Sequence, residues 1–205
     1  MATENLVKLQ ADHRGVRRKP ESLAKIKKAA RKLFVERGYH ATRPQDIARE
    51  AGLGHGTFYL HYPDKRACFL AFVDDAREEL DAYLRARRPL SGSIEKTIAA
   101  MLNAIYDYSE THPGVLATAM TDESVIDAEG VQAVPLLVRW GHDWANIVRE
   151  AAREGLAADV FDPDIIGQAI LGAIHQTGSE GARAGRTRRE VVDNLTRFLA
   201  RALKP

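Results

Sequence analysis

The sequence predicts an all-α protein with two parts, a small N-terminal helical domain and a larger C-terminal helical body. Apolar residues recur at the helical spacings i, i+3 and i+4 along most of the 205 residues. Prolines stand at the boundaries of these periodic segments, as at Pro63, Pro89, Pro113 and Pro163. No segment alternates apolar and polar residues as a half-buried strand would. We therefore expect helices joined by short connections.

The first recognisable helix covers residues 26–39 and is amphipathic. One of its faces collects the apolar side chains of Ile26, Ala29, Ala30, Leu33 and Phe34. Gly38 and Tyr39 end this helix. Thr42 opens the next one, and Pro44 suits its first turn, where a missing N–H costs nothing.

Residues 46–65 have the pattern of two short helices joined by a tight turn. Ile47, Ala48 and Ala51 give the first helix an apolar face. Gly52 stands where that helix must stop, and Leu53 is placed to plug the corner. Gly54 then stands at the N-cap of the second helix. This layout predicts a helix–turn–helix, whose second helix enters the DNA major groove.

Residues 26–72, and above all the stretch GTFYLHYPDK that ends at Lys65, resemble the DNA-binding domain of the tetracycline-repressor (TetR) family of bacterial transcription regulators. The resemblance implies that Phe58 and Tyr62 pack the domain, and that Gly56 lets the backbone approach the duplex. It implies contacts with double-stranded operator DNA at Thr42, Arg43, His55, Gly56, Thr57, Tyr59, His61 and Lys65.

Two residues depart from the family pattern, which usually has Ser or Thr in place of Gly54 and often Lys or Arg in place of His55. Glycine still caps a helix, at a loss of a few tenths of a kcal/mol. Histidine replaces a permanent charge with one that titrates near neutrality. We therefore expect operator affinity to strengthen below roughly pH 6.5 through His55 and His61. The alternative is that His55 only caps or solvates the start of its helix.

The charge of the chain is divided between its two parts. Residues 1–66 carry 15 Lys and Arg against 7 Asp and Glu, whereas residues 67–205 carry 15 against 21. A basic domain on an acidic body suits DNA binding, although basic surfaces also suit RNA or anionic membranes. We expect a basic N-terminal arm over residues 1–20, the helix–turn–helix domain over 21–66 and the body over 67–205. The arm is either a disordered tail or a segment that reaches into a minor groove.

Cysteine content and apolar runs bear on the compartment. The chain has one cysteine, Cys68, so no disulfide forms within it, which fits a reducing cytoplasm. Cys68 stands at an aliphatic family position, which favours a buried small side chain over a redox sensor. No apolar run has the length of a membrane span, and residues 1–20 lack the apolar core of a secretory signal. We expect a cytoplasmic protein that does not bind membranes.

The body is expected to consist of helices and short connections. The resemblance implies that the last two helices, near 162–178 and 188–203, form a four-helix interface in a homodimer, with residues 181–189 as the loop between them. The recurrence of glycine in the first of these helices suggests close backbone approach, because glycine inside a helix costs stability. We place the dimer contact on Ile166, Ile170, Ile174, Leu195, Phe198 and Leu199. The alternative is that these stripes fill the core of a single subunit.

The resemblance also implies a small-molecule effector held between the middle helices of the body. Such pockets are mostly apolar with few polar anchors, and a tryptophan pair four residues apart makes a broad flat wall. The candidate residues, each of which is alternatively a core residue, are Phe72, Met101, Ile105, Tyr106, Tyr108, Leu116, Met120, Trp140, Trp144 and His175. A hydrophobic effector, aromatic or acyl, fits this lining. Binding is expected to change the separation of the two DNA-binding domains, and so to release the operator.

Catalysis is not expected. The sequence has no glycine-rich phosphate loop, GxSxG elbow, HExxH or CxxC motif, and its histidines have no metal-ligand spacing. We expect no cofactor and no metal. The prediction is a ligand-responsive DNA-binding regulator, most often a repressor in this family. The competing hypothesis is a helical adaptor without specific DNA binding.

Overall fold

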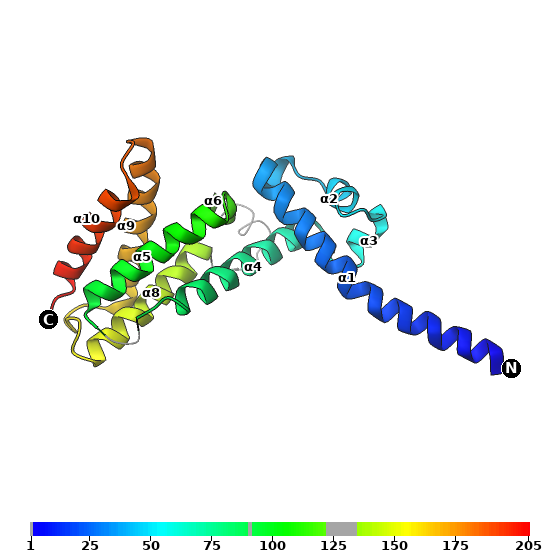
Figure 1. Cartoon of the computed structure of the whole chain (residues 1–205), viewed down its shortest axis with the longest axis horizontal. Coiled ribbons are helices and arrows are strands. Elements are labelled where there is room, and N and C mark those ends of the chain that lie inside the picture. The colour runs from blue at the N-terminus through cyan, green and yellow to red at the C-terminus, as the bar shows by residue number, and fades with distance from the viewer. Residues whose placement is uncertain (1, 90–91, 122–134) are drawn as a thin grey trace. The chain divides into compact units, whose positions relative to one another are not determined.

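The protein is described by a computed structural model covering residues 2–89, 92–121 and 135–205, with side chains placed for 19–89, 92–120 and 135–205. Every regular element among these residues is an α-helix, which confirms the predicted all-α class. The helices are α1 (Ala2–Ala41), α2 (Pro44–Glu50), α3 (His55–Tyr59), α4 (Lys65–Arg85), α5 (Ile94–Thr111), α6 (Val115–Thr121), α8 (Leu136–Arg153), α9 (Pro163–Arg183) and α10 (Arg188–Ala202) (Figure 1). The polar segment Val125–Val131, expected as a loop, lies outside the described residues.

The chain divides into two compact units within α4, after Asp75. The first unit, called the head below, holds α1, α2, α3 and α4 up to Asp75, with part of α6. The second unit, called the body, runs from Ala76 to Leu116 and through α8, α9 and α10. In the described part of the chain, no helix is long and apolar enough to span a membrane.

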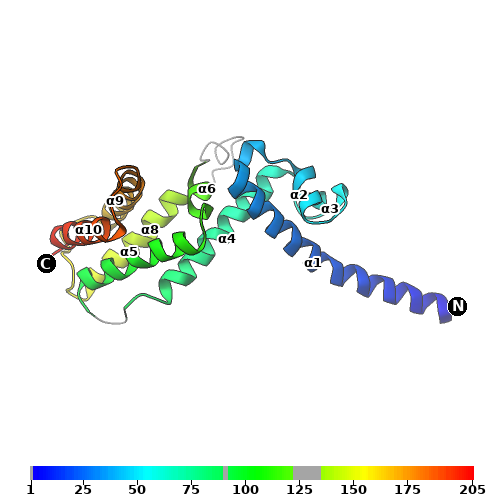
Figure 2. The same ribbon diagram turned by 45° about the horizontal axis from the view of Figure 1, so that its top comes forward.

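In the head, α1 begins at Ala2, so residues 2–20, the expected arm, are helical. Their leucine, lysine, arginine and glutamine content favours helix, and Pro20 does not interrupt it. At the other end, Gly38 has φ +76°, which breaks the regular helix where the sequence predicts. Figure 2 shows the short helices α2 and α3 next to each other beside α1.

Aromatic rings fill the centre of the head. Phe34 of α1 is completely buried, with ring centroids 5.1 Å from Phe69 and 5.8 Å from Phe72, both on α4. Tyr39 closes the cluster at 5.0 Å from Phe69. These contacts explain why the head extends into α4 as far as Asp75, because α4 supplies half of the aromatic core.

Cys68 is also part of this core and is 2% exposed. Burial, followed by the neighbouring charge of Asp75, raises the pKa of its thiol to about 12. The side chain therefore packs as a small apolar group, as the first of the two sequence interpretations holds.

In the body, α8 and α9 approach so closely that their backbones touch. A Cβ atom added at Gly167 of α9 would lie 2.2 Å from the carbonyl oxygen of Gly141 and 2.6 Å from the amide nitrogen of Ala145, both on α8. This is the close approach that the helical glycines of α9 predict. It does not hold for every one of them, because a Cβ at Gly172 would meet nothing within 4 Å.

Helix α10 is attached to α5 through Arg188. Its guanidinium lies 2.7 Å from Asp107 and donates at 3.0 Å to both the backbone oxygen and the side-chain oxygen of Asn103. The predicted 181–189 loop is wrong in extent, since α9 continues to Arg183 and α10 starts at Arg188. The start of α10 at Arg188 agrees with the helix predicted over 188–203, and a capping box explains it. The Thr187 hydroxyl accepts from the Glu190 amide, and the Glu190 carboxylate accepts from the Thr187 amide.

Candidate nucleic-acid interface

Residues 44–59 form the predicted helix–turn–helix. Helix α2 ends at Glu50 with Ala51 as its C-cap, and Gly52 has φ +67°, the left-handed conformation that reverses the chain. The amide of Leu53 then donates to Ala48 O at 2.9 Å and closes the turn. Gly54 is the N-cap of α3, as predicted, and it makes no side-chain capping hydrogen bond.

Helix α3 has one outward face and one inward face. His55, Gly56, Tyr59 and Leu60 are exposed, and Thr57 is half-buried. On the inward side, Phe58 is fully buried and its ring lies 5.9 Å from that of Tyr62. The packing roles assigned to Phe58 and Tyr62 are confirmed.

On the outward face, the rings of His55 and Tyr59 meet edge to face at 5.2 Å, and Tyr59 remains 46% exposed. The exposed side chain of Arg43 lies at the N-cap of α2. Leu60, which the sequence analysis did not select, is the most exposed of the large apolar side chains described in the head. Its signal in the sequence is an apolar residue inside an otherwise polar and aromatic motif.

Thr42 differs from its predicted role in DNA contact. The residue is completely buried, and its hydroxyl donates to Gly38 O at 2.7 Å, with Leu33 O a second acceptor at 3.2 Å. These bonds satisfy carbonyl groups at the end of α1, which lack partners within the helix. The Thr42 hydroxyl therefore joins α1 to α2 in this structure and is not available to a phosphate.

Lys65 lies in the first turn of α4, and its ammonium group reaches the end of α1. Nζ donates to Tyr39 O at 2.8 Å and lies 4.1 Å from the centroid of the Tyr39 ring. A cation at a helix C-terminus is stabilising because it complements the partial negative charge there. Lys65 thus holds α4 against α1, and its Nζ also donates to His40 O at 3.4 Å.

His61 is half-buried and is held by Ser22 of α1, with Nε2 2.7 Å from Oγ. The Ser22 hydroxyl also donates to Lys19 O at 3.0 Å, which is consistent with Nε2–H of His61 as the donor to Ser22 Oγ.

The pH dependence of operator binding expected from the sequence stays a prediction. The measurement compares operator affinity at a mildly acidic and a mildly basic pH in the wild type and in a His55→Gln, His61→Gln double variant. Equal pH dependence in the two proteins would contradict the prediction.

The predicted dimer residues fall into two groups. Ile170, Leu195 and Leu199 are 2%, 7% and 5% exposed within a single subunit, so they already belong to its core. Their part in a dimer contact stays a prediction, because a helical stripe of apolar residues does not distinguish the subunit core from a partner. Leu195 also lines a groove between α9 and α10. Phe198, by contrast, is 63% exposed, and Ile166 and Ile174 are half-buried.

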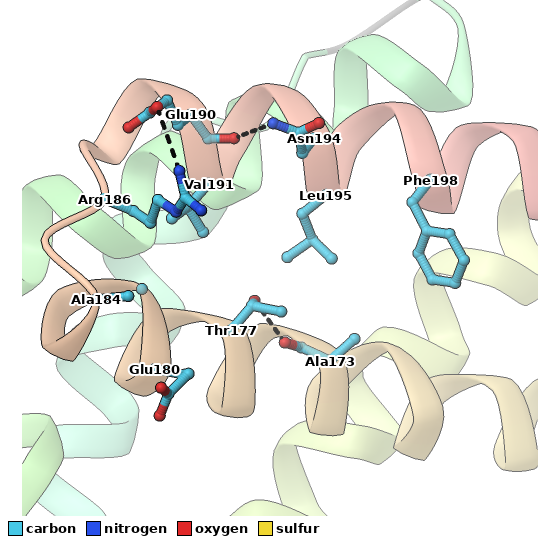
Figure 3. A pocket seen from close by; sticks show the side chains of 11 residues that line it. Ala173, Thr177, Glu180, Ala184, Arg186, Glu190, Val191, Asn194, Leu195 and Phe198 are labelled. Atoms are coloured by element: carbon cyan, nitrogen blue, oxygen red, sulfur yellow. Dashed lines mark hydrogen bonds and ion pairs between the residues drawn. The ribbon is translucent and has the colours of Figure 1, made fainter.

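Phe198 borders an open groove of about 740 Å³ between α9 and α10. Figure 3 shows Leu195 and Phe198 of α10 across this groove from Ala173 and Thr177 of α9. The small side chains on α9 do not fill the space beneath the larger ones on α10. The lining is apolar at the centre, with Glu180, Arg186 and Glu190 among its polar residues.

The predicted effector residues are separated in the structure. Phe72 packs in the aromatic core of the head, and His175 lies on the exposed side of α9, so neither lines an interior site of the body. Met120 belongs to the head unit. The residues that lie in the body on α5, α6 and α8 are Met101, Ile105, Tyr106, Tyr108, Leu116, Trp140 and Trp144.

Tyr108 and Trp140 are both buried in the body, but they differ in whether their polar atom has a hydrogen-bond partner among the described residues. Tyr108 is 1% exposed, and its hydroxyl is 3.0 Å from a carboxylate oxygen of Glu79 on α4. Trp140 is 7% exposed, and its buried Nε1 has no hydrogen-bond partner among the described residues. A buried donor without a partner is unusual, because it costs about 1–3 kcal/mol.

The helical head with its helix–turn–helix, joined to a larger helical body, defines the class of DNA-binding bacterial transcription regulators. A family model described as "Bacterial regulatory proteins, tetR family" matches residues 26–72. The HTH-type transcriptional regulator UidR of Escherichia coli K12 is 32% identical over 144 residues, covering 69% of this chain and 69% of its own length. The chain belongs to the TetR family of transcriptional regulators, with a DNA-binding helix–turn–helix.

More distant relatives agree with this assignment. YuxN of Bacillus subtilis, an uncharacterised HTH-type regulator, is 24% identical over 56% of this chain, and the match spans only 39% of YuxN. The fatty acid degradation regulator FadR of Bacillus halodurans superposes with a TM-score of 0.70 over 86% of this chain and 93% of its own, at 16% identity. A tetR-family regulator from a Shewanella species has a TM-score of 0.63 over 89% and 97%, at 19% identity. These structures share the fold.

Proposed function

We propose that the protein is a homodimeric, cytoplasmic repressor that binds operator DNA through its two heads and is released by a small hydrophobic effector bound in the body. The observation that carries this proposal is the outward face of α3, where His55, Gly56 and Tyr59 are exposed in the second helix of a helix–turn–helix. Arg43, Thr57, His61 and Lys65 border this face and supply polar or basic groups for the phosphates.

Dimerisation is supported by the groove between α9 and α10. An open apolar groove with an exposed Phe198 beside it is a surface that a second copy would cover. Two-fold symmetry then sets the same patch of each subunit against the other. The contact centres on Phe198, with Ile166 and Ile174 at its border.

An effector site in the body is supported by Trp140 and Trp144, which are both buried on α8. An effector that carries an oxygen acceptor would satisfy Trp140 Nε1 and gain apolar contact from the two indole rings. Such a ligand weakens operator binding if it favours a conformation in which the spacing of the heads no longer matches the half-sites.

The test titrates the purified protein against DNA from upstream of its own gene, with excess unrelated competitor, at two salt concentrations. Specific operator binding resists the competitor and weakens steeply with salt, as phosphate contacts require. If the competitor abolishes binding, the operator lies elsewhere and is sought in a random duplex library. A failure to bind any duplex at low salt would contradict the proposal and favour the adaptor.

The substitution Gly56→Ala tests DNA contact without disturbing the fold of the free protein. A Cβ at this position meets nothing within 4 Å, so Gly56→Ala is tolerated by the free protein and gains up to about 1 kcal/mol from helix propensity. On the operator, the methyl group would stand between the backbone and the duplex. We expect operator affinity to fall by roughly tenfold or more, as an overpacking cost of about 1–3 kcal/mol implies.

The measurement for Gly56→Ala pairs a binding titration with thermal unfolding. A variant with wild-type stability and weakened operator binding places Gly56 at the duplex. Unchanged affinity would remove Gly56 from the interface.

A further inference from the structure

Leu60 has no role in the packing of the head. It is the C-cap residue of α3, and its side chain is 71% exposed. A single exposed leucine on a protein surface is ordinary and needs no explanation. Leu60, however, lies on the helix that enters the major groove, so its surroundings in the DNA complex differ from its surroundings in solution.

The outward face of α3 leads directly to Leu60. The exposed residues occur at positions 55, 56, 59 and 60, a spacing of i, i+1, i+4 and i+5 that defines one side of a helix. The neighbouring Tyr59 is already in contact with His55. Leu60 comes four residues after Gly56, which has no side chain, and the space in front of Gly56 is open. The apolar side chain of Leu60 therefore lies on the same outward face as the uncovered backbone of Gly56, and in the proposed complex this face is turned toward the bases.

The major groove offers such a group one apolar feature. Guanine, adenine and cytosine present hydrogen-bond donors and acceptors there, whereas thymine also presents its C5-methyl group. A leucine that met only polar base edges would cover them without satisfying them, at a cost in affinity. We propose that Leu60 is a specificity-determining residue that selects a T·A pair in each operator half-site by contact with the thymine methyl. This inference rests on the DNA-binding function.

The test removes the methyl group from the DNA and the side chain from the protein. The full-length wild-type protein first selects its preferred duplex from a random library. Each thymine of that duplex is then replaced in turn by deoxyuridine, which lacks the methyl but keeps the pairing edge and the O4 acceptor. We expect replacement at one position in each half-site to weaken binding by about fourfold, the effect of one methyl group buried against an apolar side chain.

The same series is measured with Leu60→Ala, in which this penalty should disappear while penalties at other thymines remain. Leu60→Met, which keeps an apolar side chain of similar size, should retain it. Val160→Ala is the matched control, because Val160 is 77% exposed in the body and its loss should leave the wild-type pattern. Leu60 is exposed, so none of these variants is expected to unfold the protein.

Identical deoxyuridine penalties in the wild type and Leu60→Ala would overturn the inference. Equal weakening of all sequences in Leu60→Ala, with no position affected more than another, would also overturn it. If the library yields no preferred duplex, the DNA-binding function itself fails, which is a different result from a preferred duplex without methyl dependence.

Discussion

Replacing Phe34 by alanine should destabilise the head by about 3–5 kcal/mol, the usual cost of removing a buried phenyl ring. Phe34 is completely buried and contacts the rings of Phe69 and Phe72, so its loss opens a cavity between α1 and α4. Neighbouring rings are held by the backbone of two different helices and do not collapse fully into the space. Operator binding should be lost with the head.

The measurement is denaturant unfolding followed by far-UV circular dichroism and by tryptophan fluorescence. Both tryptophans of the chain, Trp140 and Trp144, lie on α8, so fluorescence reports on the body. Phe34→Leu serves as the matched variant, with an expected cost below about 1.5 kcal/mol because most of the apolar volume remains. Equal stability of wild type and Phe34→Ala would contradict the described core.

Replacing Gly167 by alanine should destabilise the body by about 1–3 kcal/mol or more, although alanine is the better helix former. The added methyl group would lie 2.2 Å from Gly141 O and 2.8 Å from Ala145 Cβ, distances at which the two helices must separate. The clash is with backbone, which a change of side-chain rotamer does not relieve. Denaturant unfolding followed by the fluorescence of Trp140 and Trp144 on α8 should therefore have a lower midpoint.

Gly172→Ala provides the control on the same helix. A Cβ at this position meets nothing within 4 Å, so the substitution should stabilise the protein by roughly 0.5–1 kcal/mol. If Gly167→Ala lowers the free energy of unfolding and Gly172→Ala raises it, the close approach of α8 and α9 at Gly167 is the cause of the destabilisation. A stabilised Gly167→Ala variant would show that α8 and α9 are farther apart than described.

Local chemistry made the helix–turn–helix predictable from the sequence. Gly52 is required by a left-handed turn, Gly54 occupies the N-cap and Phe58 is the buried residue of α3, all within a few neighbours of one another. The start of α10 was also predictable, because Thr187 and Glu190 have the spacing of a capping box. The end of α9 was missed, since that helix continues to Arg183.

The features that the sequence did not predict depend on tertiary contacts, which a motif or a helical periodicity does not specify. Thr42 matches a DNA-contacting position by motif, yet its hydroxyl is taken up by Gly38 O and Leu33 O in the fold. Ile170 and Leu195 belong to apolar stripes that suit either a subunit core or a dimer contact, and the structure places them in the core. Trp140 Nε1 became a candidate anchor only when its burial, with no hydrogen-bond partner in the described part of the chain, was known.

The burial of Cys68 makes the protein a convenient host for a single chemical label. Burial raises the pKa of the Cys68 thiol and shields its sulfur, so little of the reactive thiolate is accessible at neutral pH. Maleimides and mild oxidants should therefore spare the native protein. A new cysteine at an exposed site such as Val160 would then carry a fluorophore or spin label alone. Distances between labelled subunits of the proposed dimer, with and without the proposed operator, become measurable without removing the native cysteine.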